Sequence, residues 1–303
     1  MKGLGGGVGS ALARAALAVA TCGLAVSGVV VATEGTTFPG TSVPTVALAP
    51  AAAVGCEASA PYRAPERGSV GVPAGLALCS SGAVVVSIPG AVIDGWDVRG
   101  GILVDAQDVV VRRSRVTGDG STPYGIRTTA SGSVRIEDTT LTGDFTEAAI
   151  VGDRWSAERV EIVGVSHDGA WLGDGSRLRN SSIHGFLPAP GAESDALVVR
   201  STGGDVLVED SRVDLGDGPR RGSAVLLAPD EPGDRDGPTV IRGNVLGGGR
   251  YTLYQDSSAA PMPDLRITGN RFLRGSGEGP LRVARRTALE DNTYLDGGPL
   301  PER

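Results

Sequence analysis

The sequence predicts an all-β fold, a parallel β-helix (solenoid) of about nine coils. A short strand-like pattern recurs at intervals near 22 residues, which is typical of a repeat protein. The 47 Gly and 19 Pro disfavour long helices, because each interior Gly costs a helix about 1 kcal/mol relative to Ala. Only 4% of the residues are aromatic, while Val, Leu, Ile and Ala are abundant, which suits a narrow, layered β-structure with an aliphatic core.

The repeat reads apolar, any residue, apolar, two polar residues, a Ser, Thr or Asn position, any residue, apolar. Alternating apolar residues in each copy predict a strand with one side buried. A second short apolar run precedes most copies, so each coil supplies at least two strands. One coil cannot bury its apolar side alone, but stacked coils form a continuous core. The copies start at residues 91, 109, 134, 155, 176, 206, 239, 265 and 287.

The polar positions of the repeat predict ladders along the solenoid. At the fourth and fifth positions, opposite charges mostly fall on adjacent copies, as expected if equivalent positions stack directly. We interpret them as a solvated structural ladder, because exposed ion pairs contribute only about 0–1 kcal/mol and need no function. Asn244, Asn270 and Asn292 share the sixth position, where Asn can adopt left-handed turns and stack into hydrogen-bonded ladders.

The N-terminal region predicts export. Two basic residues precede an 18-residue apolar stretch within residues 1–32, which predicts a signal peptide. The alternative is an uncleaved N-terminal membrane anchor, because 18 residues approach the length that spans a bilayer. Residues 33–60 are rich in Thr, Pro, Ala and Gly and predict a flexible linker. Residues 61–303 then form the β-helix domain, which is secreted or held on the outer face of the membrane.

Two of the three cysteines predict a disulfide. Cys22 lies inside the export segment, which leaves Cys56 and Cys79 in an oxidising compartment. Their disulfide would tie the start of the domain to its first strand, and two free thiols are the alternative.

The charge of the chain argues against nucleic acid as a partner. The formal net charge is −7, and Lys2 is the only lysine. Because binding to a phosphate backbone depends on Lys and Arg, an acidic chain without a basic tract is unsuited to it. A membrane partner follows only if the N-terminal segment stays uncleaved, and we expect a monomer.

Two stretches carry a family resemblance. PGAVIDGWDVRGGILVDAQDVVVRRSRVTG (89–118) and MPDLRITGNRF (262–272) resemble secreted bacterial right-handed parallel β-helix repeat proteins of the pectate lyase superfamily. The resemblance covers about residues 70–298 and implies a right-handed helix that engages polysaccharide. Such solenoids include polysaccharide lyases, glycoside hydrolases, uronan epimerases, phage tailspikes and adhesins, so the resemblance specifies the fold better than the reaction.

The candidate chemistry lies in the middle coils, where residues 186–195 and 228–238 form long insertions. Glu147, Asp168 and Asp195 each lead into a second strand. If these positions stack, three carboxylates stand about 5 Å apart, a separation that suits acid/base catalysis or a bound Ca²⁺. The alternative is ordinary turn chemistry, because Asp before Gly or Ala is common at the start of a strand.

Further candidates surround these carboxylates. A uronan lyase or epimerase must neutralise a substrate carboxylate and remove a proton, which suits Arg and His. In relatives this loop tends to read His-Asn-Asp-Gly, whereas here residues 193–196 read Glu-Ser-Asp-Ala and only the Asp matches. The predicted catalytic residues are Asp195, Asp168, His167 and Arg200, and the predicted substrate-binding residues are Glu193, Arg179, Trp171 and Tyr254.

The sequence therefore supports two functions. The first is a secreted uronan lyase or related carbohydrate-active enzyme, with Ca²⁺ as a candidate cofactor. The alternative is a noncatalytic carbohydrate-binding or structural protein of the cell envelope or matrix.

Overall fold

The computed structural model describes residues 70–200, 204–216, 222–229, 237–258, 261–262 and 264–301, together with the backbone of two short upstream strands. This described part contains strands and turns and no helix. Accordingly, it offers no helical segment that could span a membrane. The predicted flexible linker lies outside the described residues, apart from one of the upstream strands.

The strands form three sheets of ten, which we name A, B and C. Sheet A contains β1 (Val29–Val31), β4 (Val84–Val86), β7 (Ile102–Val104), β10 (Tyr124–Thr128), β13 (Ala148–Val151), β16 (Asp168–Leu172), β19 (Leu197–Val199), β22 (Ser223–Leu227), β25 (Tyr251–Gln255) and β28 (Gly279–Arg282). Sheet B contains β2 (Ala53–Gly55), β5 (Val92–Asp94), β8 (Val109–Arg112), β11 (Val134–Glu137), β14 (Trp155–Glu158), β17 (Arg177–Arg179), β20 (Val206–Glu209), β23 (Thr239–Arg242), β26 (Leu265–Thr268) and β29 (Ala288–Glu290). Sheet C contains β3 (Cys79–Ser81), β6 (Trp96–Arg99), β9 (Arg115–Asp119), β12 (Thr140–Asp144), β15 (Glu161–Val165), β18 (Ser182–His184), β21 (Arg212–Asp214), β24 (Val245–Gly247), β27 (Arg271–Phe272) and β30 (Thr293–Tyr294).

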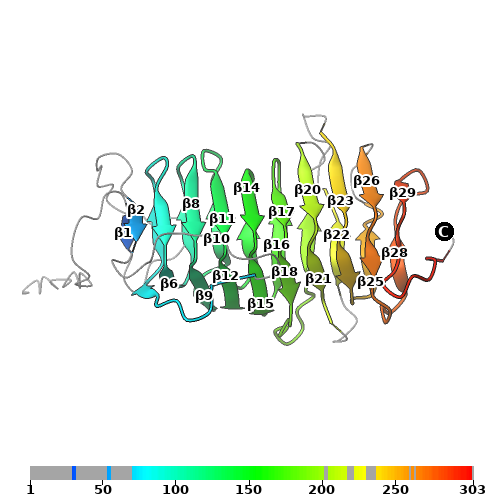
Figure 1. Ribbon diagram of the computed structural model, residues 1–303, viewed down its shortest axis with the longest axis horizontal. Coiled ribbons are helices and arrows are strands. Elements are labelled where there is room, and N and C mark those ends of the chain that lie inside the picture. Colours follow the sequence, from blue (N-terminus) through cyan, green and yellow to red (C-terminus); the bar gives the residue numbers. More distant parts are fainter. Residues whose placement is uncertain are drawn as a thin grey trace, which may run out of the picture.

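The chain visits the sheets in the order A, B, C and repeats this order nine times from β4 to β30. Each strand pairs in parallel with its equivalent one coil away, so the coils lie side by side along one axis (Figure 1). The exception in sheet A is β1, which runs antiparallel to β4 and falls within the predicted signal segment. The protein is a right-handed parallel β-helix, which confirms the predicted fold class.

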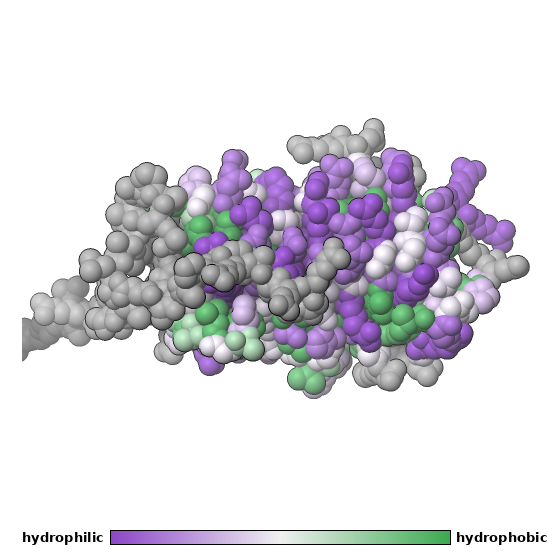
Figure 2. Space-filling view, in the orientation of Figure 1, coloured by the Kyte–Doolittle hydropathy of each residue, from purple (hydrophilic) through white to green (hydrophobic). Residues whose placement is uncertain are grey.

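The interior is a column of stacked aliphatic side chains. In sheet B, Val109, Val134 and Trp155 are in register on successive coils, and all three are buried. Trp155 fills this inward position, as the repeat predicts for core residues. On the face that Figure 2 shows, polar side chains cover much of the surface, with small apolar patches between them. The apolar residues of each coil are therefore buried by its neighbours, which is the source of stability in a solenoid.

The turn between sheets B and C is made by the repeat itself. The fifth position has a positive φ in every copy: it is Gly95, Arg113, Asp138, Arg159, Asn180, Asp210, Gly243, Gly269 and Asp291. This left-handed residue bends the chain between the two strands. The prediction that the asparagines take the left-handed turn is wrong by one position, because Gly243, Gly269 and Asp291 take it instead.

The asparagines form the predicted ladder inside this turn. Asn244 and Asn270 are fully buried. The backbone N–H of Asn244 donates to Asn270 Oδ1 at 3.0 Å, and that of Asn270 donates to Asn292 Oδ1 at 3.0 Å. Ser181 and Ser211 continue the ladder through side-chain oxygens that accept backbone N–H groups. The sixth position thus satisfies backbone donors that the turn would otherwise leave buried without partners.

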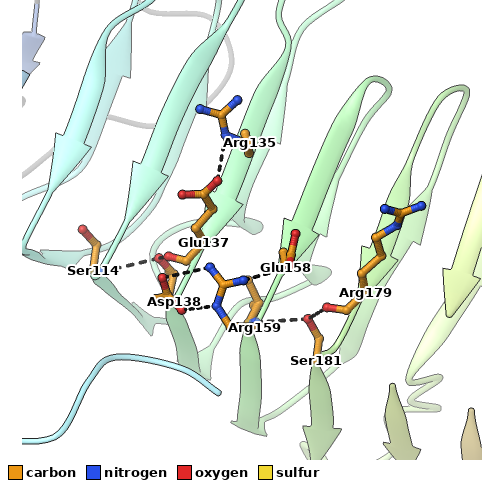
Figure 3. A network of polar contacts seen from close by, with 10 residues as sticks. Ser114, Arg135, Glu137, Asp138, Glu158, Arg159, Arg179 and Ser181 are labelled. Atoms are coloured by element: carbon orange, nitrogen blue, oxygen red, sulfur yellow. Dashed lines mark hydrogen bonds and ion pairs between the residues drawn. The ribbon is translucent and has the colours of Figure 1, made fainter. Parts of the chain in front are cut away.

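The charges beside the turn also pair between coils, as predicted. Arg159 Nε lies 2.6 Å from Asp138 Oδ1 on the preceding coil (Figure 3). Asp94 pairs with Arg112 and Arg113, and Glu209 lies between Arg179 and Arg242 at 2.6 and 2.5 Å. Arg179 therefore belongs to this structural ladder on sheet B.

Cys79, at the start of β3, is disulfide-bonded. Cys56 lies outside the described residues, so its pairing with Cys79 stays a prediction.

Candidate functional site

Two of the three predicted carboxylates meet at the edge of sheet A. Asp195 precedes β19, and Ala170 of β16 is in register with Leu197 of β19, which places Asp168 level with Asp195. The backbone N–H of Asp195 donates to Asp168 Oδ1 at 2.8 Å. One coil further, the N–H of Ser223 donates to Asp195 Oδ1 at 2.6 Å. The same position on successive coils thus forms a ladder of carboxylates accepting backbone N–H groups.

Glu147 does not join this ladder. Asp168 is in register with Ala148, so Glu147 is one residue out of register, and its side chain is exposed. A shift of one residue turns a strand side chain to the opposite face. The predicted metal set of Glu147, Asp168 and Asp195 is therefore wrong. Among the described residues no three His, Cys, Asp or Glu side chains are placed to hold a metal ion, so the donors present do not fit a Ca²⁺ site.

Both aspartates line a pocket of about 380 Å³. Its walls come from the outer side of sheet A and from the loops that follow β19, β22 and β25. Arg200 supplies a cation, and Val198 and Leu226 form an apolar floor between the charged groups. The lining residues are Asp168, Asp195, Val198, Arg200, Leu226, Ala228, Pro229, Asp256 and Ser258.

Trp171 connects Asp168 with Arg200. Its indole Nε1–H donates to Asp168 Oδ2 at 2.7 Å, so both oxygens of Asp168 accept a hydrogen bond. The guanidinium carbon of Arg200 lies 4.6 Å from the centroid of the Trp171 ring, within cation–π distance. The ring also meets Tyr124 edge to face, with centroids 5.9 Å apart. The predicted substrate-binding residue Trp171 is therefore fixed by three neighbours beside the pocket.

Burial changes the acidity of both carboxyls, but unequally. Burial raises the pKa of Asp195 to about 7, and the neighbouring Asp168 charge adds to this increase. Burial also raises the pKa of Asp168, but the bonds from the Asp195 N–H and the Trp171 indole oppose the increase. A carboxyl whose pKa lies near neutral pH can take up and release a proton under working conditions. Asp195 has this property, and Asp168 is the better stabilised anion beside it.

His167 and Glu193 lie beside the pair without lining the pocket. His167 Nδ1 lies 3.0 Å from Ser166 Oγ, and Ser166 Oγ donates to Asp144 Oδ1 at 2.5 Å. This places the imidazole in a polar cluster at the corner between sheets C and A. The charge of Glu193 is close enough to contribute to the raised pKa of Asp195.

The two remaining predicted residues, Tyr254 and Arg179, lie on different sheets of the solenoid. Tyr254 of β25 is in register with Leu226, which places it on the same outer face of sheet A as the pocket. Arg179 of β17 lies on sheet B, pairs with Glu209 and does not line the pocket, so the structure does not bring it together with the aspartates.

Several residues of this face were missed by the sequence reasoning. They are Tyr124, Arg127, Leu226, Arg282, Asp256 and Ser258. A usable signal was present for three of them, because Tyr124, Arg127 and Leu226 lie in the short apolar runs that precede most repeat copies.

Comparisons of the chain with protein-family models, with curated proteins and with solved structures found no match. The function is therefore argued from the site alone.

Proposed function

We propose that this is an exported protein that binds a polysaccharide on the outer face of sheet A and cleaves it at the Asp168/Asp195 pair, as a uronan lyase. The observation that carries the proposal is the aspartate pair. Its two carboxyls lie on adjacent coils and line a polar pocket, and the pKa of Asp195 is raised to about 7. A turn aspartate needs neither a pocket nor a perturbed pKa, and their combination is typical of catalytic groups.

The lining suits a sugar that carries a carboxylate. Arg200 can pair with an anionic group, because guanidinium matches carboxylate geometry with two N–H donors. The Trp171 ring packs against the Arg200 guanidinium and lies beside the aspartates. An aromatic ring in this place can also contact the apolar face of a sugar. The pocket thus places a cation, a proton acceptor and an aromatic ring around one position.

In the proposed reaction Asp195 acts as the base. Arg200 holds the uronate carboxylate and withdraws charge from it, which makes the neighbouring ring proton more acidic. The Asp195 carboxylate removes that proton from C5, and the electron pair forms the C4–C5 double bond. The C4–O bond breaks, and the departing oxygen takes up a proton from solvent water. Burial, with the neighbouring charge of Asp168, raises the pKa of Asp195 to about 7, so Asp195 can act as a base at neutral pH.

The test is turnover on a panel of polyuronates, followed by the ultraviolet absorbance of the unsaturated product and by a reducing-end assay. We expect product from the wild-type protein and a loss of at least about a hundredfold with Asp195→Asn, the usual size of a general-base contribution. Glu147→Gln is the matched control, because Glu147 is exposed and out of register with the pair. It should leave turnover unchanged.

Two results would count against the lyase. Glycan binding without product in either assay would identify the noncatalytic binding protein that the sequence also allows. Reducing ends without unsaturated product would show hydrolysis at the same site.

A further inference from the structure

Three arginine–aromatic pairs follow one another along the outer face of sheet A. Arg127 lies 5.2 Å from the ring centroid of Tyr124, and Arg200 lies 4.6 Å from that of Trp171. Arg282 lies 5.8 Å from the centroids of both Tyr251 and Tyr254, whose rings stack at 5.7 Å. The middle pair belongs to the pocket, and the function proposed above uses neither outer pair.

The sheet register places these pairs in a line. Arg127 is in register with Val151, Trp171 with Val198, Leu226 with Tyr254, and Tyr254 with Arg282. These positions belong to one outward row from β10 to β28, six strand steps long. At about 4.8 Å for each step the row spans roughly 29 Å. It runs along the axis of the solenoid and passes the Asp168/Asp195 pair near its middle.

The row repeats the chemistry that an anionic glycan requires. Aromatic rings contact the apolar faces of sugar rings, and arginine binds their anionic groups. Between these pairs the row carries the apolar residues Val198 and Leu226, which are in register and line the pocket. Arg127, Arg200 and Arg282 lie along this face, which also carries the carboxyls of the pocket, so the arginines are the groups there that can pair with an anionic chain.

We propose that the Tyr124/Arg127 pair and the Tyr254/Arg282 pair are outer binding subsites for one extended, linear anionic glycan, whose central sugar lies in the Asp168/Asp195 pocket. This inference rests on the proposed function and deepens it: it assigns new residues, a direction for the bound chain and a preference for long chains. A pocket acting alone would bind short and long chains equally well.

The experiment measures oligogalacturonate binding by calorimetry, from the disaccharide to the octasaccharide, in an Asp195→Asn background that prevents turnover. We expect affinity to rise with chain length until the chain reaches the outer subsites. Arg127→Gln and Arg282→Gln should each lower affinity for the octasaccharide about threefold to tenfold, and the double variant by the product of the two effects. Disaccharide binding should not change.

Arg266→Gln is the matched control, because Arg266 is an exposed arginine in the same coil as Tyr254 but on sheet B. It should leave every affinity unchanged. The proposal of outer subsites is overturned if oligogalacturonates bind but Arg127→Gln and Arg282→Gln leave the affinity unchanged at all chain lengths, as Arg266→Gln should. It is also overturned if neutral cello-oligosaccharides of equal length bind as tightly and respond to the same variants. Failure of all oligosaccharides to bind would instead refute the proposed function itself.

Discussion

Asp168 and Asp195 occupy the same position on adjacent coils, yet their surroundings give them different properties. Asp168 accepts hydrogen bonds on both oxygens, from a backbone N–H and from the Trp171 indole. Asp195 accepts one from Ser223 and faces the charge of Asp168. When neighbouring groups push two pKa values apart, the groups can take different catalytic roles. In the proposed reaction, proton transfer therefore falls to Asp195 and charge stabilisation to Asp168.

The raised pKa of Asp195 makes the fold sensitive to pH. The pKa of this group is about 7 in the folded state and near 3.8 when unfolded, so between these values the folded protein binds the extra proton. The free energy of unfolding should therefore fall as the pH rises from about 4 to about 7, by up to a few kcal/mol. Denaturant unfolding at a series of pH values measures this slope.

Asp195→Asn removes the titration but keeps an oxygen that can accept the Ser223 N–H. The slope between these pH values should become shallower, and the variant should be more stable than the wild type at pH 7. An identical slope in both proteins would show that Asp195 titrates normally.

Trp171 can be tested separately from the aspartates. Trp171→Phe keeps an aromatic ring under Arg200 but removes the indole N–H that Asp168 accepts. The pKa of Asp168 should rise, because the anion loses a donor, and the pKa of Asp195 should fall, because its neighbour carries less charge. Carboxyl chemical shifts followed by NMR across the pH range report both values. Tyr254→Phe, which removes a hydroxyl from the same face, should change neither.

Sequence reasoning named the two aspartates that line the pocket but missed most of the other lining residues. Asp168 and Asp195 could be predicted because each precedes a recognisable apolar run at a repeat interval. Glu147 was wrongly included because the residue at which a strand begins decides which face of the sheet a side chain lies on. Counting the spacing between repeat copies cannot fix that residue to within one position. Arg200, His167 and Glu193 were correctly placed near the pair by proximity in the chain.

At the scale of the element, the turn between sheets B and C shows which part of the repeat is structural. Its fifth position bends the backbone, and its sixth position supplies oxygens to the N–H groups of the previous coil. The sequence predicted the ladder, because three asparagines recur at one position. It misplaced the left-handed residue, because Asn, Asp and Gly all tolerate positive φ and stand next to each other here.

Removing one residue of the asparagine ladder should lower the free energy of unfolding. Asn270 is fully buried, donates to Ile241 O and Asn292 Oδ1, and accepts from Asn244. Asn270→Ala leaves these buried groups without partners, at about 1–3 kcal/mol for each group. We expect the free energy of unfolding to fall by about 3 kcal/mol in total, measured by denaturant unfolding.

The matched control is Asn180→Gly, at an exposed turn position with a φ of 47°. Glycine adopts this conformation readily, so stability should stay within about 1 kcal/mol of the wild type. Equal losses for the two variants would contradict the structural role of the ladder.

At the scale of the whole molecule, the fold was accessible from sequence because a solenoid repeats one local pattern. The repeat copies supply the strands of sheets B and C, and the preceding apolar runs supply sheet A. The long loops that help to form the pocket have no such repetition, so the residues they bring together could not be aligned. The solenoid therefore gives a regular row of outward positions, and the loops convert one part of that row into a pocket.

The central claim is that Asp195 transfers the proton in polysaccharide cleavage, and a pH–rate profile on the polyuronate that is cleaved best tests it most directly. Because the base must be ionised, kcat/KM should rise with pH through about 7, the pKa of Asp195, and then level off. Asp195→Asn should lose both the activity and the rise. Cleavage by Asp195→Asn at the wild-type rate, or a wild-type profile that is flat between pH 5 and pH 8, would contradict the account.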